Sequence, residues 1–198
     1  MNARSRTAAL TCVALALAIV MTACGSTAKV GAPTASGPAA GASSVKPKPA
    51  AEVGTRANPA TIGQVVTISQ SGVPQWEVSL SAPSLDATAA VAAGNQFNEA
   101  APAGMVYAEV TVNVKRLADK AATPGFDLSV KFVSAAGTTH STSDHMAVVA
   151  GSLTDLGEMY APATAAGVVV VAIPVADAAA GTWTVSSMFG YPTFFKAV

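Results

Sequence analysis

Residues 105–115 alternate apolar and polar side chains without interruption. Successive side chains of a β-strand point to opposite faces, so a period of two gathers the apolar side chains on one face. A strand of this kind is typical of an antiparallel sheet that covers a core with one side. The pattern therefore predicts a half-buried strand. Its inward set is Val106, Ala108, Val110, Val112 and Val114, and its outward set is Tyr107, Glu109, Thr111, Asn113 and Lys115.

Shorter segments with strand character recur along the rest of the chain. Alternation over residues 76–81 and 126–132 predicts two more strands. Ala136 and Gly137 predict a hairpin turn before a short strand at residues 138–141. Further strands are expected at residues 65–69, 147–150, 167–173, 182–188 and 193–198. The alternation places four aromatic side chains in the core, namely Trp76, Phe126, Phe132 and Trp183.

The run of residues 168–173 is apolar on both faces, which predicts a central strand that ends at Pro174. Helical patterns are short and comprise a turn within residues 153–159 and an alanine-rich stretch at residues 86–93. About seven to nine short strands separated by turn signals are typical of a β-sandwich. The predicted fold is all-β, an immunoglobulin-like antiparallel β-sandwich that occupies residues 53–198.

The segment before this domain has a composition that cannot form a core. Residues 25–52 consist almost wholly of Ala, Gly, Pro, Ser and Thr, with few charges. Such a composition predicts a disordered linker. As a flexible coil, 28 residues would span roughly 30 Å on average. We therefore expect residues 24–52 to act as a spacer that holds the domain clear of a membrane surface, to which Cys24 would be attached.

The first 24 residues have the order of a secretory signal peptide. Arg4 and Arg6 precede an apolar run at residues 8–21, and Met21-Thr22-Ala23-Cys24 resembles the lipobox of bacterial lipoproteins. The run is short for a membrane-spanning helix, which needs roughly 20 apolar residues. This length argues against the first alternative, a retained transmembrane anchor. The second alternative is ordinary cleavage after Ala23 without a lipid, and the bulk of Met21 argues against it.

These features predict a signal peptide at residues 1–23 and a lipid on Cys24. A diacylglyceryl cysteine carries two acyl chains, which stable anchoring requires. The expected location is the extracytoplasmic face of a bacterial cell membrane.

Cysteine usage and charge narrow the chemistry of the domain. The chain has two cysteines, Cys12 and Cys24, and neither lies in residues 53–198. The domain therefore has no cysteine for a disulfide, a thiolate zinc site or a thiol nucleophile. From residue 53 onward six basic and ten acidic side chains give a net charge of −4. A mildly acidic domain is not expected to bind nucleic acid or to dock electrostatically on anionic lipid.

Several segments resemble a known family. Residues 54–59 (Gly-Thr-Arg-Ala-Asn-Pro), Ile62-Gly63 and Trp76-Glu77-Val78 look like the opening of a telokin-like, immunoglobulin-like domain of unknown function. Residues 103–107, 167–174 and the closing aromatics fit the same pattern. The family is common in lipoproteins of actinobacteria and other Gram-positive bacteria. The resemblance implies a disulfide-free sandwich without an established activity or catalytic residues. The loops at residues 115–118 and 161–165 depart from the family pattern.

Two histidines and a group of basic side chains are the polar candidates for a site. His140 and His145, with Asp144 and Asp155, are the candidates for a metal or catalytic cluster. Their odd spacing would point the two imidazoles to opposite faces of a strand, and a zinc site would need another ligand. Solvent-exposed loop histidines are the plainer interpretation. Lys115, Arg116 and Lys120 are expected in a strand-end loop, with a docking patch for an acidic cell-wall polymer as the alternative.

Aromatic side chains in expected loops are the stronger binding candidates. Phe97 lies in the polar segment between Gly94 and Gly104, and Phe189 and Tyr191 lie between two expected strands. Loops at the end of a sandwich commonly carry binding surfaces, although these rings could instead fold back onto the core.

We expect a lipid-anchored, non-enzymatic binding module without a cofactor. Its partner would be an envelope protein or a cell-wall ligand, held by Phe97, Phe189 and Tyr191. The alternatives are an envelope hydrolase or metal-binding protein that uses His140 and His145, and a passive structural or surface-antigen lipoprotein.

Overall fold

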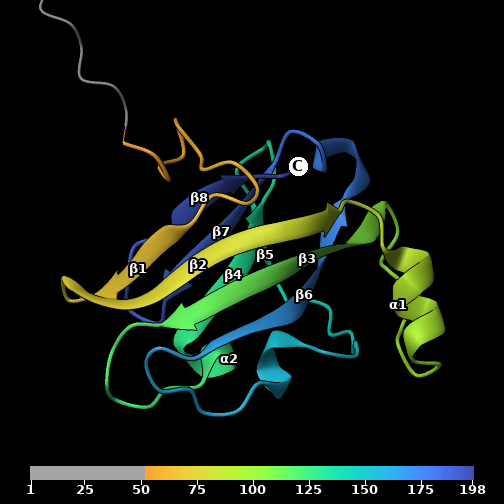
Figure 1. Cartoon of the computed structure of the whole chain (residues 1–198). Coiled ribbons are helices and arrows are strands. Elements are labelled where there is room, and N and C mark those ends of the chain that lie inside the picture. The colour runs from red at the N-terminus through yellow and green to blue at the C-terminus, as the bar shows by residue number, and fades with distance from the viewer. Residues whose placement is uncertain (1–51) are drawn as a thin grey trace, which may run out of the picture. The chain divides into compact units, whose positions relative to one another are not determined.

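The structure, a computed structural model, describes residues 52–198, and the predicted signal peptide, Cys24 and the spacer up to residue 51 lie outside these residues. The described part forms two four-stranded antiparallel sheets (Figure 1). The first sheet runs in the order β1 (Val66–Gln70), β2 (Val73–Ser84), β3 (Met105–Arg116) and β6 (Thr164–Pro174). The second runs in the order β5 (Thr139–Ser141), β4 (Leu128–Val133), β7 (Thr182–Ser187) and β8 (Thr193–Lys196).

Helices are few and short. They comprise α1 (Thr88–Gly94), α2 (Pro124–Asp127) and the 3₁₀ turns η1 (Leu153–Asp155) and η2 (Val175–Asp177). The alanine-rich stretch and the turn expected near residue 153 thus appear as α1 and η1. Within residues 52–198 no helix has the length and apolar character needed to cross a membrane.

The connectivity is that of an immunoglobulin-like sandwich. With β1 set aside, β2, β3 and β6 occupy one sheet, and β5, β4, β7 and β8 occupy the other. This is an A-B-E sheet facing a C′-C-F-G sheet in the nomenclature of immunoglobulin domains. The structure thus confirms the predicted all-β sandwich, and the eight strands within residues 52–198 lie within the expected range.

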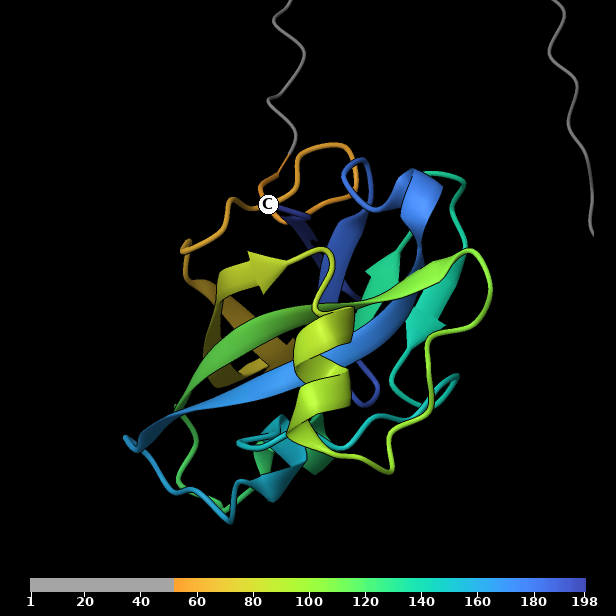
Figure 2. The same ribbon diagram turned by 90° about the vertical axis from the view of Figure 1, so that its right-hand side faces the viewer.

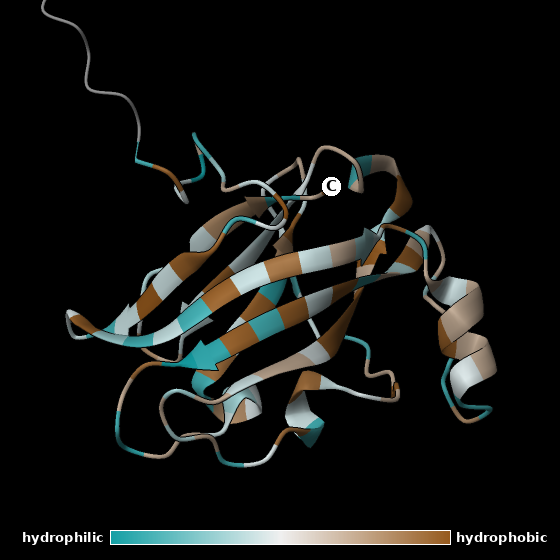
Figure 3. Cartoon of the chain, viewed as in Figure 1, coloured by the Kyte–Doolittle hydropathy of each residue, from teal (hydrophilic) through white to brown (hydrophobic). Residues whose placement is uncertain are grey.

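The long alternating segment forms β3, an interior strand of the first sheet, as the predicted half-buried strand. Ala108, Val110 and Val112 are fully buried, and the intervening polar positions are half exposed. The register with β6 runs unbroken from the Met105–Pro174 pair to the Lys115–Thr164 pair. Figure 3 shows the resulting bands of apolar and polar residues along β2 and β3.

Large aromatic side chains fill the space between the sheets. Trp76, Phe132, Trp183 and Phe195 are fully buried. The rings of Phe132 and Trp183 meet edge to face, with their centroids 5.2 Å apart. Aromatic pairs favour this geometry because the positive ring edge meets the negative ring face. Three of the four predicted core aromatics are therefore confirmed.

Phe126, the fourth, was wrongly predicted to be core. Pro124 begins the single turn of α2, and the Phe126 N–H donates to the Thr123 carbonyl at 3.0 Å. The ladder with β7 starts only at the Leu128–Ser187 pair. Phe126 therefore lies outside the strand, and it is 73% exposed.

The prediction that β6 is a central strand was also wrong, because β6 lies at the edge of its sheet. Its outer face is apolar because α1 packs over it (Figure 2). This second cluster consists of Ala87, Val91, Tyr107, Val170 and Ala172. Tyr107, predicted to point outward into solvent, is 2% exposed, and its hydroxyl donates to the Glu99 carbonyl at 3.2 Å.

Residues 147–150 do not form the predicted strand. The Asn98 side-chain amide takes the place of a strand partner: its Nδ2 donates to the Val148 carbonyl at 2.9 Å, and its Oδ1 accepts the Val148 N–H at 2.8 Å. The neighbouring Ala147 and Val149 pack against the cluster under α1. The segment is therefore a strap over the outer face of β6 rather than part of a sheet.

Candidate functional site

A cleft of about 590 Å³ opens between the two sheets, on the side where β4 and β6 approach each other. Its walls come from β4, β6 and the segment that connects β5 to η1. Most of the large side chains in these walls are apolar, and Lys131 is the single charged lining residue among those that the structure describes. The principal apolar lining residues are Phe126, Leu128, Met146, Val149, Leu153 and Met188.

The cleft exists because β5 stops early. Its ladder with β4 contains three pairs and ends at Lys131–Ser141. There Asp144 folds the chain into a turn: its carboxylate accepts the Ser141 N–H at 2.7 Å and the Ser141 hydroxyl at 2.9 Å. These two bonds favour the charged form and hold the pKa of Asp144 below its ordinary value of 3.8, with smaller contributions from His140 and His145.

The early end of β5 leaves the backbone of Val130 facing the cleft. Backbone groups of a strand alternate in direction, and the Ser134 N–H donates toward the β5 side, to the Thr138 carbonyl at 2.8 Å. Val130 lies four residues earlier and so faces the same side. The last pair of the ladder is Lys131–Ser141, so Val130 lies just beyond it.

The edge of β6 faces the cleft from the opposite sheet. The Val168 N–H donates to the Gly151 carbonyl at 2.8 Å, so alternate residues from Val168 onward point away from β3. Val170 is the next such residue, and both valines line the cleft. Two strand edges of opposite sheets thus flank one apolar space.

Two glycines let η1 close one end of the cleft. A Cβ on Gly167 would lie 2.5 Å from the Leu153 Cα, and a Cβ on Gly125 would lie 2.6 Å from the Thr154 Cα. Only hydrogen fits at such separations, so η1 lies directly between α2 and β6. The turn is further fixed by a capping box between Ser152 and Asp155.

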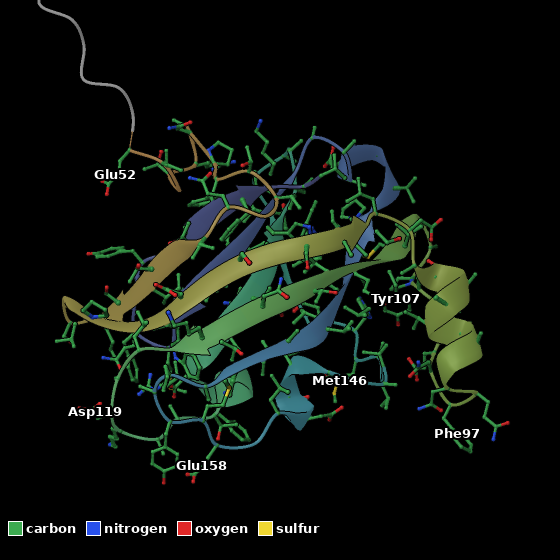
Figure 4. All side chains as sticks on the ribbon, in the orientation of Figure 1. Glu52, Phe97, Tyr107, Asp119, Met146 and Glu158 are labelled. Atoms are coloured by element: carbon green, nitrogen blue, oxygen red, sulfur yellow. The ribbon has the colours of Figure 1, made fainter. Side chains whose placement is uncertain are left out.

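The mouth of the cleft carries exposed, flexible apolar side chains. Met146 is 79% exposed and Met188 is 61% exposed, and Phe126 lies near Met188 because the Met188 N–H donates to the Asp127 carbonyl at 3.1 Å. Met146 lies below β6 in the view of Figure 4. Sequence reasoning missed this site because its walls meet only after the chain has crossed between the sheets.

The sequence-predicted aromatics are exposed but do not share one surface. Phe97 is 83% exposed beyond α1 (Figure 4), whereas Phe189 and Tyr191 lie in the β7–β8 loop and are 84% and 96% exposed. The loop after α1, which carries Phe97, leads into the start of β3. The β7–β8 loop lies at the other end of this sheet, because the Ser187 hydroxyl at the end of β7 donates to the Ser69 carbonyl near the end of β1. The 12 residues of β3 separate the two ends by roughly 35 Å.

The histidines do not assemble a metal centre. His140 pairs with Phe132 across the sheet and is half-buried, whereas His145 is exposed. Asp155 is engaged in the capping box of η1. Within residues 52–198 no group of three or more His, Cys, Asp or Glu side chains is placed to hold a metal ion.

The three basic residues expected in one strand-end loop are divided. Lys115 and Arg116 belong to β3, and Lys115 pairs with Glu77 at 3.0 Å. Arg116 is 2% exposed, and its guanidinium donates to the Lys120 and Gln75 carbonyls. The docking patch considered for an acidic polymer is therefore not formed.

Comparison with known proteins adds two structural likenesses. An uncharacterised β-sandwich protein from Clostridium difficile 630 is 14% identical, covering 69% of this chain and 93% of that chain, with a TM-score of 0.39. A conserved hypothetical protein from Bacillus anthracis is 12% identical, covering 67% and 96%, with a TM-score of 0.38. No family model matches the sequence, and no curated protein does.

Proposed function

We propose that the chain is a lipid-anchored protein of the bacterial cell envelope whose domain binds an extended apolar peptide segment in the β4–β6 cleft. The lipobox-like sequence that ends at Cys24 supports the proposed anchoring to the membrane. The opening segment at residues 54–59 supports a place among telokin-like domains of envelope lipoproteins. The cleft supports the activity, which is binding rather than catalysis.

The observation that carries the proposal is the early end of the β4–β5 ladder beside an apolar wall. A peptide that adds to this edge would extend the ladder of β4 beyond the Lys131–Ser141 pair, past Val130. In such complexes the backbone bonds give affinity, and pockets for alternate side chains give specificity. The apolar lining, which includes Leu128 and Leu153, would take apolar side chains of the peptide.

The chemistry of the lining favours binding over catalysis. General acid–base catalysis needs positioned titratable groups, and Lys131 is the one such side chain in the cleft walls that the structure describes. The remaining polar lining groups are hydroxyls, such as Ser129 and Thr154, which can orient a ligand. Methionines at the mouth suit a surface that adapts to a ligand, because their side chains are unbranched and polarisable.

A charge placed at the mouth of the cleft tests the binding activity. In the full chain, Met146→Glu combined with Met188→Glu should abolish crosslinking to the partner in intact envelopes, without a change in melting temperature. Phe97→Glu combined with Val175→Glu is the matched control, because both positions are exposed and lie outside the cleft. Equal loss in both double variants would contradict a role for the cleft.

The proposed membrane anchoring has a separate test. The Cys24→Ser variant should leave the membrane fraction and appear in the medium. A variant that stays in the membrane fraction would argue for a retained membrane-spanning segment instead.

A further inference from the structure

The most exposed aromatic side chains of the second sheet lie in the β7–β8 loop. Phe189 and Tyr191 are 84% and 96% exposed, and Met188 beside them is 61% exposed. Exposed neighbouring apolar side chains mark an interaction site more often than isolated ones do. Met188 lines the cleft, whereas Phe189 and Tyr191 do not.

The β1–β2 turn lies beside this loop. The Ser187 hydroxyl donates to the Ser69 carbonyl at 3.3 Å, and a Cβ on Gly190 would lie 3.4 Å from the same oxygen. This contact brings the β1–β2 turn next to the β7–β8 loop. Val73, just after that turn, is 56% exposed. Val73 therefore extends the surface formed by Phe189 and Tyr191, and we call these three residues the aromatic tip.

The aromatic tip is free of charge along the chain on both sides. Residues 65–76 and residues 178–195 contain no Asp, Glu, Lys or Arg. A surface that recognises a charged polymer or an acidic protein would carry complementary charges. A tip whose own residues carry no charge and include Phe and Tyr instead fits the interface between lipid headgroups and acyl chains, where amphipathic rings are enriched.

The tip lies at the end where the preceding chain joins the domain. A Cβ on Gly54 would lie 2.7 Å from Thr193 Cγ2, and the Phe194 N–H donates to the Gly54 carbonyl at 2.7 Å. Thr193 is two residues after Tyr191. Figure 4 shows Glu52 and Phe97 on opposite sides of the view. Cys24 precedes Glu52 by 28 residues.

We infer that the aromatic tip inserts into the membrane interface and orients the domain on the bilayer to which the chain is tethered. The inference rests on the proposed anchor at Cys24. Tethering makes the second contact intramolecular, so a weak insertion is sufficient at the high effective concentration of lipid. A lipid chain and an inserted loop act as two signals for one membrane.

Photocrosslinking from two equally exposed positions tests the inference. The lipidated full chain is reconstituted in phosphatidylcholine vesicles with a photoreactive phenylalanine analogue at Phe189, or at Phe97 as the control with an exposure of 83%. We expect lipid adducts to be severalfold more abundant from position 189 than from position 97. Equal yields, or adducts at 189 that are all to protein, would overturn the inference.

Two further arms separate insertion from other causes. Addition of phosphatidylglycerol should leave the yield unchanged, and a yield that depends on anionic lipid would overturn insertion in favour of electrostatic docking. Phe189→Ser combined with Tyr191→Ser should retain the melting temperature and lower the lipid adducts from a photoreactive group at Val73. Unchanged adducts from Val73 would also overturn the inference.

These experiments distinguish a tip that does not insert into the membrane from a failure of the proposed function. A chain that fractionates with membranes but gives no lipid adduct from Phe189 retains the anchor and the cleft, and loses only the inserted tip. A wild-type chain that is absent from the membrane fraction would overturn both the proposed address and the orientation inferred here. Binding in the cleft is reported separately by Met146→Glu combined with Met188→Glu.

Discussion

The guanidinium carbon of Arg116 lies 4.8 Å from the centroid of the Trp76 ring, its cross-strand partner between β2 and β3. Both residues are buried, and the guanidinium also donates to the Gln75 and Lys120 carbonyls at 3.1 Å and 2.7 Å. Arg116 therefore joins β2, the end of β3 and the following loop. A charge that the sequence would place on the surface instead closes one end of the core.

Removal of this guanidinium should destabilise the domain. Arg116→Met retains an apolar stem but removes the guanidinium donors to the Lys120 carbonyl, one of the two donors to the Gln75 carbonyl and the cation–π contact, a loss of about 2–4 kcal/mol. Urea denaturation of the full chain measures the change. Arg56→Met, at an exposed position, should change the free energy of unfolding by less than about 0.5 kcal/mol. Equal effects of the two substitutions would contradict the role of Arg116.

The turn at Asp144 predicts a dependence on pH. Its bonds from Ser141 lower the pKa of the carboxyl in the folded chain, so its contribution to stability is present above the ordinary value of 3.8. That contribution is lost as the pH falls through the lowered pKa. The difference in free energy of unfolding between wild type and Asp144→Asn should therefore be present at neutral pH and shrink in acid. Denaturation across this range measures the difference, and a difference independent of pH would contradict the argument.

Sequence patterns predict those strands in which the alternation of apolar and polar residues matches the face that is buried in the structure. The alternation of β3 identifies both the strand and its inward face because one side of that sheet meets the core. The same logic fails for Tyr107 and β6, since α1 and the strap at residues 147–150 cover the outer face. It fails for Phe126 because Pro124 begins a turn inside the alternating segment.

The cleft could not be predicted from the sequence. It depends on where β5 ends, which the local bonds of Asp144 decide, and on how closely η1 approaches β6. The exposed loop aromatics were identifiable as candidates. Their separation to opposite ends follows from the length of β3 and from the order of the strands.

The outer cluster under α1 should be as sensitive as the main core. Tyr107→Ala removes a buried ring and should cost about 3–5 kcal/mol. Tyr107→Phe removes only the bond to the Glu99 carbonyl and should cost about 1 kcal/mol. Thermal and urea unfolding compare the two variants. A small effect of Tyr107→Ala would mean that the ring is solvent-facing, as the alternation alone suggested.

Close packing of η1 against β6 predicts intolerance at Gly167. Gly167→Ala would place a methyl group within 2.5 Å of the Leu153 Cα, so the backbone of η1 or β6 must shift. Overpacking of this kind should cost about 2–3 kcal/mol. Gly157→Ala is the control, since a Cβ there meets nothing within 4 Å. Denaturation midpoints that fall equally in both variants would contradict a specific contact at Gly167.

The central claim is that the β4–β6 cleft binds an extended apolar segment of an envelope protein. The most direct measurement is photocrosslinking in intact envelopes from a photoreactive side chain in place of Met146, with the same group in place of Phe97 as the control. We predict one discrete protein adduct from position 146, absent from position 97, whose crosslinked peptide is apolar. No protein adduct from position 146, or the same adducts from both positions, would contradict it.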